Sequence, residues 1–152
     1  MYVTLTQQTT PLDSDLETPV GLFIRLVGEQ QGILLESAEV DGRWGRYSII
    51  ATDFVLSANC QHGKLHVQAS DPVLAPLLAF SRLPYPAALP QRINALEIEG
   101  LKDQYAPITR ALYGYLGYGI AGMFEPKLAT TLPPEEAEAS LVLPGTLIVF
   151  DH

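Results

Sequence analysis

Apolar positions near the start of the chain repeat with the period of a helix. They recur at i, i+3, i+4 and i+7 from Val20 to Val27, which predicts a helix with one apolar face. Thr18 suits the N-cap of this helix, and Pro19 suits its first turn because a proline there loses no needed hydrogen bond. Gly28 allows the helix to end.

Other segments alternate with the period of a strand. Residues 54–60 and 65–69 alternate apolar and polar positions around a turn at 61–64, which predicts a β-hairpin with one face on a core. The continuous apolar run Ile33 to Leu35 is typical of a strand covered on both faces. Further strands are predicted at 111–118 and 147–150.

The remaining segments carry weaker signals. Asp71 and Pro72 favour a second helix start, with Pro76 shortening or kinking that helix. The three prolines of 83–90 predict a connector. The sequence also predicts a strand within 93–98, a short helix at 120–124 and a polar surface loop at 127–139.

These elements mix helices and strands without regular βαβ alternation, which favours an α+β fold. We expect a mostly antiparallel sheet with a few packed helices. Residues 1–14 are interpreted as an extended N-terminal arm, and residues 15–152 as one domain. A chain of 152 residues can bury a core of this size.

Composition narrows the possible partners. The net charge is −8, and the chain has only nine Lys and Arg residues. Nucleic acids and anionic membranes attract clustered cations, so neither is expected as a partner. No apolar run reaches the roughly 18 residues of a membrane span, and the N-terminus lacks a signal-peptide pattern. The lone Cys60 forms no internal disulfide and is compatible with a reducing cytoplasm, where we expect the protein.

Catalytic and cofactor signals are weak. The histidines His62, His66 and His152 show no metal-binding spacing, and the chain has no phosphate-binding glycine loop, so no metal and no cofactor are expected here. The glycine-rich segment GYLGYGIAG is interpreted as a site of close packing. Tyr115 of this segment and Tyr113 just before it would share one side of a strand.

One group of residues has the composition of a ligand site. An amino acid needs an anion for its ammonium, a cation or N–H for its carboxylate and an apolar slot for its side chain. Glu36, Ser37, Arg46 and the run ending at Leu35 contain all three types. A salt bridge between Glu36 and Arg46, with Ser37 in a turn, is the alternative, and the residues alone leave it open.

Five segments between Glu17 and His152 carry a family resemblance. The chain resembles the N-terminal domain of the large subunit of anthranilate synthase, and the related aminodeoxychorismate synthase large subunit has the same architecture. The matching segments occur in the family's order and read ETPVGLF, LLESAE, RWGRYSII, GYLGYG and VFDH. The resemblance implies the N-terminal portion of that fold.

The resemblance also implies a function. The family's large subunit is a lyase that makes anthranilate from chorismate, with magnesium and with ammonia from a glutamine amidotransferase subunit. Its chorismate-binding and magnesium-binding residues lie in a C-terminal domain absent here, so this stretch is expected to be non-catalytic. By the same resemblance Ser37 contacts L-tryptophan in an allosteric feedback site, with Glu36 beside it, Pro19 lining the pocket and Arg46 as a basic pocket residue.

Two positions depart from the family pattern. Gly119 follows Tyr118 where many relatives have a carboxylate, and Arg110 and Ala111 replace a glycine pair. Neither departure falls within the LLES segment, residues 34–37. Two alternatives stay open: the corresponding part of an aminodeoxychorismate synthase, in the folate pathway, or a free-standing amino-acid-binding or interaction domain.

Overall fold

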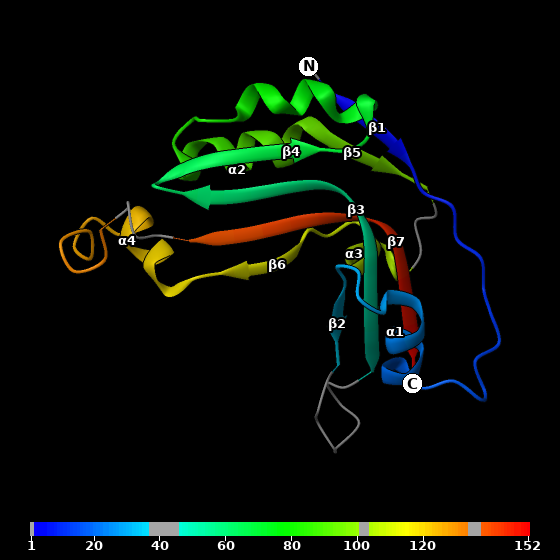
Figure 1. Cartoon of the computed structure of the whole chain (residues 1–152). Coiled ribbons are helices and arrows are strands. Elements are labelled where there is room, and N and C mark those ends of the chain that lie inside the picture. Colours follow the sequence, from blue (N-terminus) through cyan, green and yellow to red (C-terminus); the bar gives the residue numbers. More distant parts are fainter. Residues whose placement is uncertain (1, 37–45, 101–103, 134–137) are drawn as a thin grey trace. The chain divides into compact units, whose positions relative to one another are not determined.

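A computed structural model describes residues 2–36, 46–100, 104–133 and 138–152. The chain divides into two compact units. Figure 1 labels the helices and strands. The first unit comprises Met1–Gln8 and Val55–Leu143, and the second comprises Thr9–Phe54 and Pro144–His152. The predicted domain boundary at residue 14 stays a prediction. Residues Val3–Thr6 of the expected arm form a strand, β1.

The α+β fold is confirmed. The larger sheet has the strand order β2-β3-β7-β6, with β4 also paired to β3. Its β2–β3, β3–β4 and β6–β7 pairs are antiparallel, while β1 pairs in parallel with β5. Strands β3 (Tyr47–Gln61) and β7 (Ala139–Asp151) contribute residues to both units.

The other elements belong to one unit each. The second unit holds α1 (Pro19–Val27) and β2 (Ile33–Leu35). The first unit holds β1, β4 (Lys64–Ala69), η1 (Pro72–Phe80), α2 (Tyr85–Ala95), β5 (Leu96–Glu99), α3 (Ala106–Thr109), β6 (Tyr113–Leu116), η2 (Tyr118–Ile120) and α4 (Ala121–Phe124).

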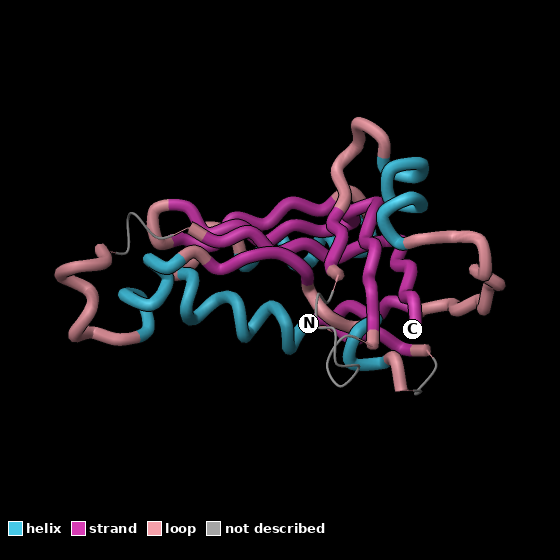
Figure 2. The backbone as a smooth tube through the Cα atoms, turned by 90° about the horizontal axis from the view of Figure 1, so that it is seen from below, coloured by secondary structure: helices cyan, strands magenta, loops and turns pink. Residues whose placement is uncertain are grey.

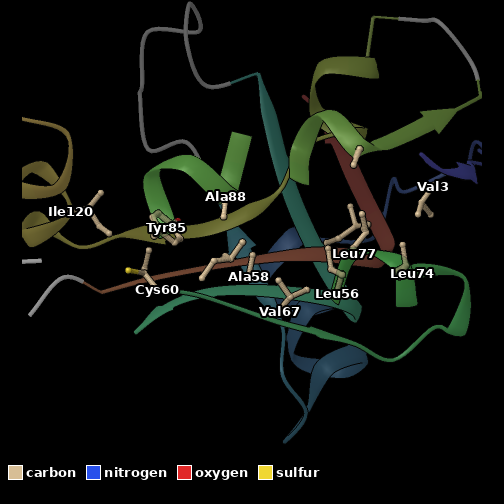
Figure 3. Packing of buried hydrophobic residues seen from close by; sticks show 14 residues of the cluster. Val3, Leu56, Ala58, Cys60, Val67, Leu74, Leu77, Tyr85, Ala88 and Ile120 are labelled. Atoms are coloured by element: carbon tan, nitrogen blue, oxygen red, sulfur yellow. The ribbon is translucent and has the colours of Figure 1, made fainter. Parts of the chain in front are cut away.

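In the first unit, helices lie beside strands (Figure 2). The core of this unit is a cluster of buried apolar side chains from both kinds of element (Figure 3). Every second residue of β3 from Leu56 to Cys60 is buried, as the predicted hairpin requires. These side chains cluster with residues of β4, η1 and α2, including Leu65, Leu74 and Tyr85. Cys60 is therefore a buried apolar residue, and burial raises the pKa of its thiol.

Helix α2 corrects the sequence prediction. The segment 83–90, predicted to be a connector, begins an 11-residue helix that ends at Ala95. Pro86 stands in the first turn, where no amide hydrogen is needed, but Pro90 lies inside the helix. The helix forms because packing overrides propensity: Tyr85, Ala88, Arg92 and Ala95 form a buried face.

Local signals at the other helix starts are confirmed. The Thr18 hydroxyl accepts a hydrogen bond from the Gly21 amide at 3.1 Å, and the Asp71 carboxylate accepts one from the Val73 amide at 2.9 Å. With Pro76 inside it, the second of these segments forms the 3₁₀ helix η1. A 3₁₀ helix and α4 occupy 118–124, close to the predicted short helix.

Apolar residues of the second unit are less covered than predicted. Only Val27 of the α1 apolar face is buried, while Val20 and Ile24 are exposed. The predicted covering of β2 on both faces is wrong, because β2 is an edge strand and Leu35 is exposed. Exposed apolar residues that lie together on one surface are typical of an interaction site.

Tyr113 and Tyr115, predicted to share one side of a strand, differ in burial. Tyr113 is buried and donates a hydrogen bond from its hydroxyl to the Ile108 carbonyl oxygen at 2.6 Å, whereas Tyr115 is exposed. Gly114 between them has φ +148°, so the strand is not regular at this point. Burial raises the pKa of Tyr113 to about 12.

We expect the free energy of unfolding to fall at alkaline pH because Tyr113 ionises more easily in the unfolded chain than in the folded one. An unfolded tyrosine ionises near pH 10, whereas the buried one keeps its proton to about pH 12. The contribution is complete below pH 10 and is lost as pH rises to 12, by about 3 kcal/mol. Denaturant unfolding from pH 8 to 11.5 should therefore show a shallower decline for Tyr113→Phe than for the wild type. Tyr115→Phe should follow the wild type, and equal slopes for all three would contradict the assignment.

Candidate functional site

The predicted site residues belong to the second unit. Leu35 ends β2, and Glu36 follows it; both are exposed. The register pairs Leu35 with Ile49, so the end of β2 lies beside the start of β3, just after Arg46. Glu36 and Arg46 thus flank the same end of the β2–β3 ladder. Ser37, the central residue of the prediction, lies outside the described residues.

Pro19 reaches this region through α1. It occupies the first position of that helix, which packs against β2, and its side chain is partly buried. Beside it the Arg25 guanidinium pairs with the Glu17 carboxylate, so the ETPVGLF segment is tied together by charge as well as by the Thr18 cap. The structure therefore brings Pro19, Leu35 and Glu36 into one unit with Arg46.

Arg46 has a partner that the sequence did not indicate. Its Nε and one terminal nitrogen donate to the two oxygens of the Asp151 carboxylate at 2.5 and 2.8 Å. The guanidinium also lies over the Tyr47 ring, 5.1 Å from the centroid. A bidentate pair fixes both position and orientation of an arginine. In the described part of the chain, Arg46 pairs with Asp151 and not with Glu36.

The end of β7 continues this network. The backbone amide of His152 donates to the Arg46 carbonyl oxygen at 2.9 Å, and its ring shares a hydrogen bond with the hydroxyl of buried Ser48 at 2.8 Å. The His152 ring also stacks on Phe150, with centroids 6.3 Å apart. Residues 46–48 and 150–152, about a hundred residues apart in sequence, therefore meet through these contacts.

This arrangement of charged side chains can bind polar groups. Its charged groups are Glu36, at the end of β2, and the Arg46–Asp151 pair, which joins the residue before β3 to the end of β7. Within residues 2–36, 46–100, 104–133 and 138–152, no three His, Cys, Asp or Glu side chains lie close enough to hold a metal ion. The expected lack of a metal and of a cofactor stays a prediction. No helix in the described ranges is long and apolar enough to cross a membrane.

Comparison with curated proteins supports the family assignment. The chain is 35% identical over 144 residues to anthranilate synthase component 1 of Arthrobacter globiformis, a match covering 91% of this chain and 26% of that protein. It is 27% identical to the protein of the same name from Acinetobacter calcoaceticus over 91% of this chain and 28% of the relative. A third relative of this name, from Aquifex aeolicus, is 27% identical over 94% of this chain.

The chain is related to anthranilate synthase component 1. The resemblance seen in the sequence is thereby confirmed, and it extends along nearly the whole chain. The chain spans about a quarter of the length of these curated relatives. No family model matches the chain, and no solved structure matches it.

Proposed function

We propose that this chain is the N-terminal regulatory part of an anthranilate synthase component 1 and that it contributes the tryptophan feedback site. The observation that carries the proposal is the match of 91% of the chain to about a quarter of relatives named for this enzyme. Chorismate binding, magnesium binding and the lyase step would belong to the rest of such a protein, with ammonia coming from a glutamine amidotransferase subunit.

The chemistry of the second unit supports a site for an amino acid. The exposed Glu36 carboxylate offers a partner for an ammonium group, and Ser37 offers a hydroxyl. Leu35 and Pro19 offer apolar surface. The Asp151 carboxylate already neutralises the Arg46 guanidinium, so Arg46 would orient or share a tryptophan carboxylate instead of binding it as a free cation.

Regulation requires that tryptophan distinguish two states of the enzyme. A ligand shifts an equilibrium only by its difference in affinity for those states. The exposed apolar residues Val20 and Ile24, four residues apart on α1, offer a surface on which a catalytic domain could pack, and tryptophan bound beside it would bias that packing. The names of the relatives favour anthranilate over aminodeoxychorismate as the product, and no observation specifically favours a free-standing domain.

The experiment is tryptophan inhibition of the full-length enzyme carrying Ser37→Ala. Loss of one hydrogen bond to a charged ligand group costs about 1.5–3 kcal/mol, so the inhibition constant should rise at least about tenfold. Turnover without tryptophan should stay close to that of the wild type, because the substitution is remote from the proposed lyase step.

Ser14→Ala is the matched control, since Ser14 is an exposed serine of the same unit. Its inhibition constant should equal that of the wild type. Unchanged inhibition in Ser37→Ala would contradict the proposed site. A full-length product other than anthranilate would contradict the proposed enzyme, so the two failures can be told apart.

A further inference from the structure

A cavity of about 790 Å³ lies in the first unit, outside the proposed tryptophan site. Its walls are formed by α2 and β5, by the segment that leads into β6, and by β7. Most of its lining is apolar, and two arginines, Arg92 and Arg110, contribute to it. The lining includes Ile93, Leu96, Ile98, Leu112, Leu141 and Leu143. A volume of this size is within the range of small-molecule sites.

Arg92 is the unusual member of this lining. Its exposed fraction is 2%, and it is one of the largest fully buried side chains of the protein. Its Nε and one terminal nitrogen, Nη1, are buried and have no hydrogen-bond partner in the described part of the chain. Burial lowers the pKa of Arg92 to about 10, which still leaves the guanidinium charged at neutral pH.

The neighbouring groups do not neutralise this charge. The Tyr85 hydroxyl, two helical turns away on the same buried face, stays neutral because burial raises its pKa to about 12. Glu97 also lines the cavity, but it is exposed, and no ion pair joins it to Arg92 among the described residues. Arg110 adds a second positive charge, and one of its nitrogens donates to the Gly100 carbonyl oxygen at 3.2 Å.

A buried charge without a counter-charge is costly, and native proteins rarely keep one without a partner. An anion in the cavity would supply that partner. An inorganic ion would leave the apolar walls against water, whereas an organic carboxylate with an apolar body would satisfy both parts of the lining. A carboxylate can also pair with a guanidinium through two parallel hydrogen bonds in planar geometry.

We propose that this cavity binds a small organic carboxylate, with the carboxylate against Arg92 and the apolar body against Leu96, Leu112 and Leu141. The site is independent of the proposed tryptophan site, because its residues all belong to the first unit. Its failure would therefore leave the proposed function untouched.

The test is calorimetric or NMR titration of the 152-residue chain with benzoate at neutral pH. Benzamide, its neutral analogue, and acetate, which lacks the ring, are the comparison probes. We expect benzamide to bind at least about tenfold more weakly than benzoate, because charge-assisted hydrogen bonds contribute about 1.5–3 kcal/mol. Acetate should also bind more weakly, because it cannot cover the apolar walls.

Arg92→Met should weaken benzoate binding at least about tenfold. Arg25→Met is the control, since Arg25 is an exposed arginine of the second unit, and it should bind benzoate as the wild type does. Leu112→Trp, which fills the cavity and keeps Arg92, should abolish binding and provides a second readout if Arg92→Met does not fold. Equal affinity for benzoate and benzamide, or full affinity in Arg92→Met or Leu112→Trp, would overturn the site.

An aspartate or glutamate side chain from another part of a longer protein could supply the same chemistry. The benzoate titration, repeated on the full product of the gene, distinguishes the two sources. Retained binding supports a free ligand. Loss of binding there, with binding kept in the 152-residue chain, would show that polypeptide fills the cavity and would overturn the free ligand.

Discussion

Gly114→Ala should destabilise the first unit by about 3 kcal/mol or more, because a backbone clash adds to an unfavourable conformation. A Cβ atom added to Gly114 would lie 1.9 Å from the Ser140 carbonyl oxygen, in the neighbouring strand β7. That oxygen belongs to backbone, so it cannot rotate away as a side chain could. The φ of +148° is one that residues with a Cβ rarely adopt. Urea or thermal unfolding would measure the loss.

Gly28→Ala is the matched control. Gly28 also has a positive φ, +54°, but a Cβ there would meet no atom within 4 Å. Only the conformational cost remains, because Gly28 has φ 54° and ψ −118°, a sparsely populated region for a residue with a Cβ. That cost is about 1–3 kcal/mol. If the two variants lost equal stability, the close approach of β6 to β7 would be wrong. Both substitutions place a Cβ in a conformation that favours glycine, but only Gly114→Ala adds a clash with backbone, so Gly114→Ala should lose more stability.

The two positions show how far glycine patterns can be interpreted from sequence. The GYLGYGIAG segment indicated close packing, and this is confirmed at Gly114 and at Gly122, where a Cβ would lie 2.0 Å from the Leu132 carbonyl oxygen. The strand register that brings Ser140 against Gly114 could not be predicted, because it depends on residues about 26 positions later in the chain.

Local signals predicted local structure. Thr18 and Asp71 cap their helices through contacts within three residues, and the 54–69 hairpin follows from alternation and a short turn. Helix α2 was missed because Pro86 and Pro90 are strong local signals against a helix interior. Its buried face, from Tyr85 to Ala95, becomes visible only once the sheet that covers it is known.

Only part of the candidate site could be predicted from the sequence. The residue types at Glu36 and Arg46 could be recognised as suited to an amino acid, and their closeness follows from the β2–β3 hairpin-like register. The partner of Arg46 could not be recognised, since Asp151 lies 105 residues later in the sequence. The buried charge of Arg92 gave no sequence signal either, because an arginine on a helix is usually exposed. The sequence therefore does not determine how a charged residue is paired or buried by residues that lie far from it in the chain.

Leu65→Ala should destabilise this chain and the proposed full-length enzyme alike, whereas Ile24→Ala should destabilise only the proposed full-length enzyme. Leu65 is 0% exposed in the core of the first unit, so its truncation should cost about 2–5 kcal/mol in either protein. Ile24 is 65% exposed on α1, so its truncation should change the stability of this chain by at most about 0.5 kcal/mol.

The proposed full-length enzyme provides the informative comparison for Ile24. If its proposed catalytic domain packs on the apolar face of α1, Ile24 becomes buried there, and its truncation should cost at least about 1 kcal/mol. Lys127→Ala, at an exposed position of the first unit, is the control and should be nearly neutral in both proteins. Unfolding curves of both proteins measure these changes. An Ile24→Ala variant that is neutral in the full-length enzyme would mean that α1 is not covered there. The exposed apolar face would then need another explanation than the domain contact on which tryptophan is proposed to act.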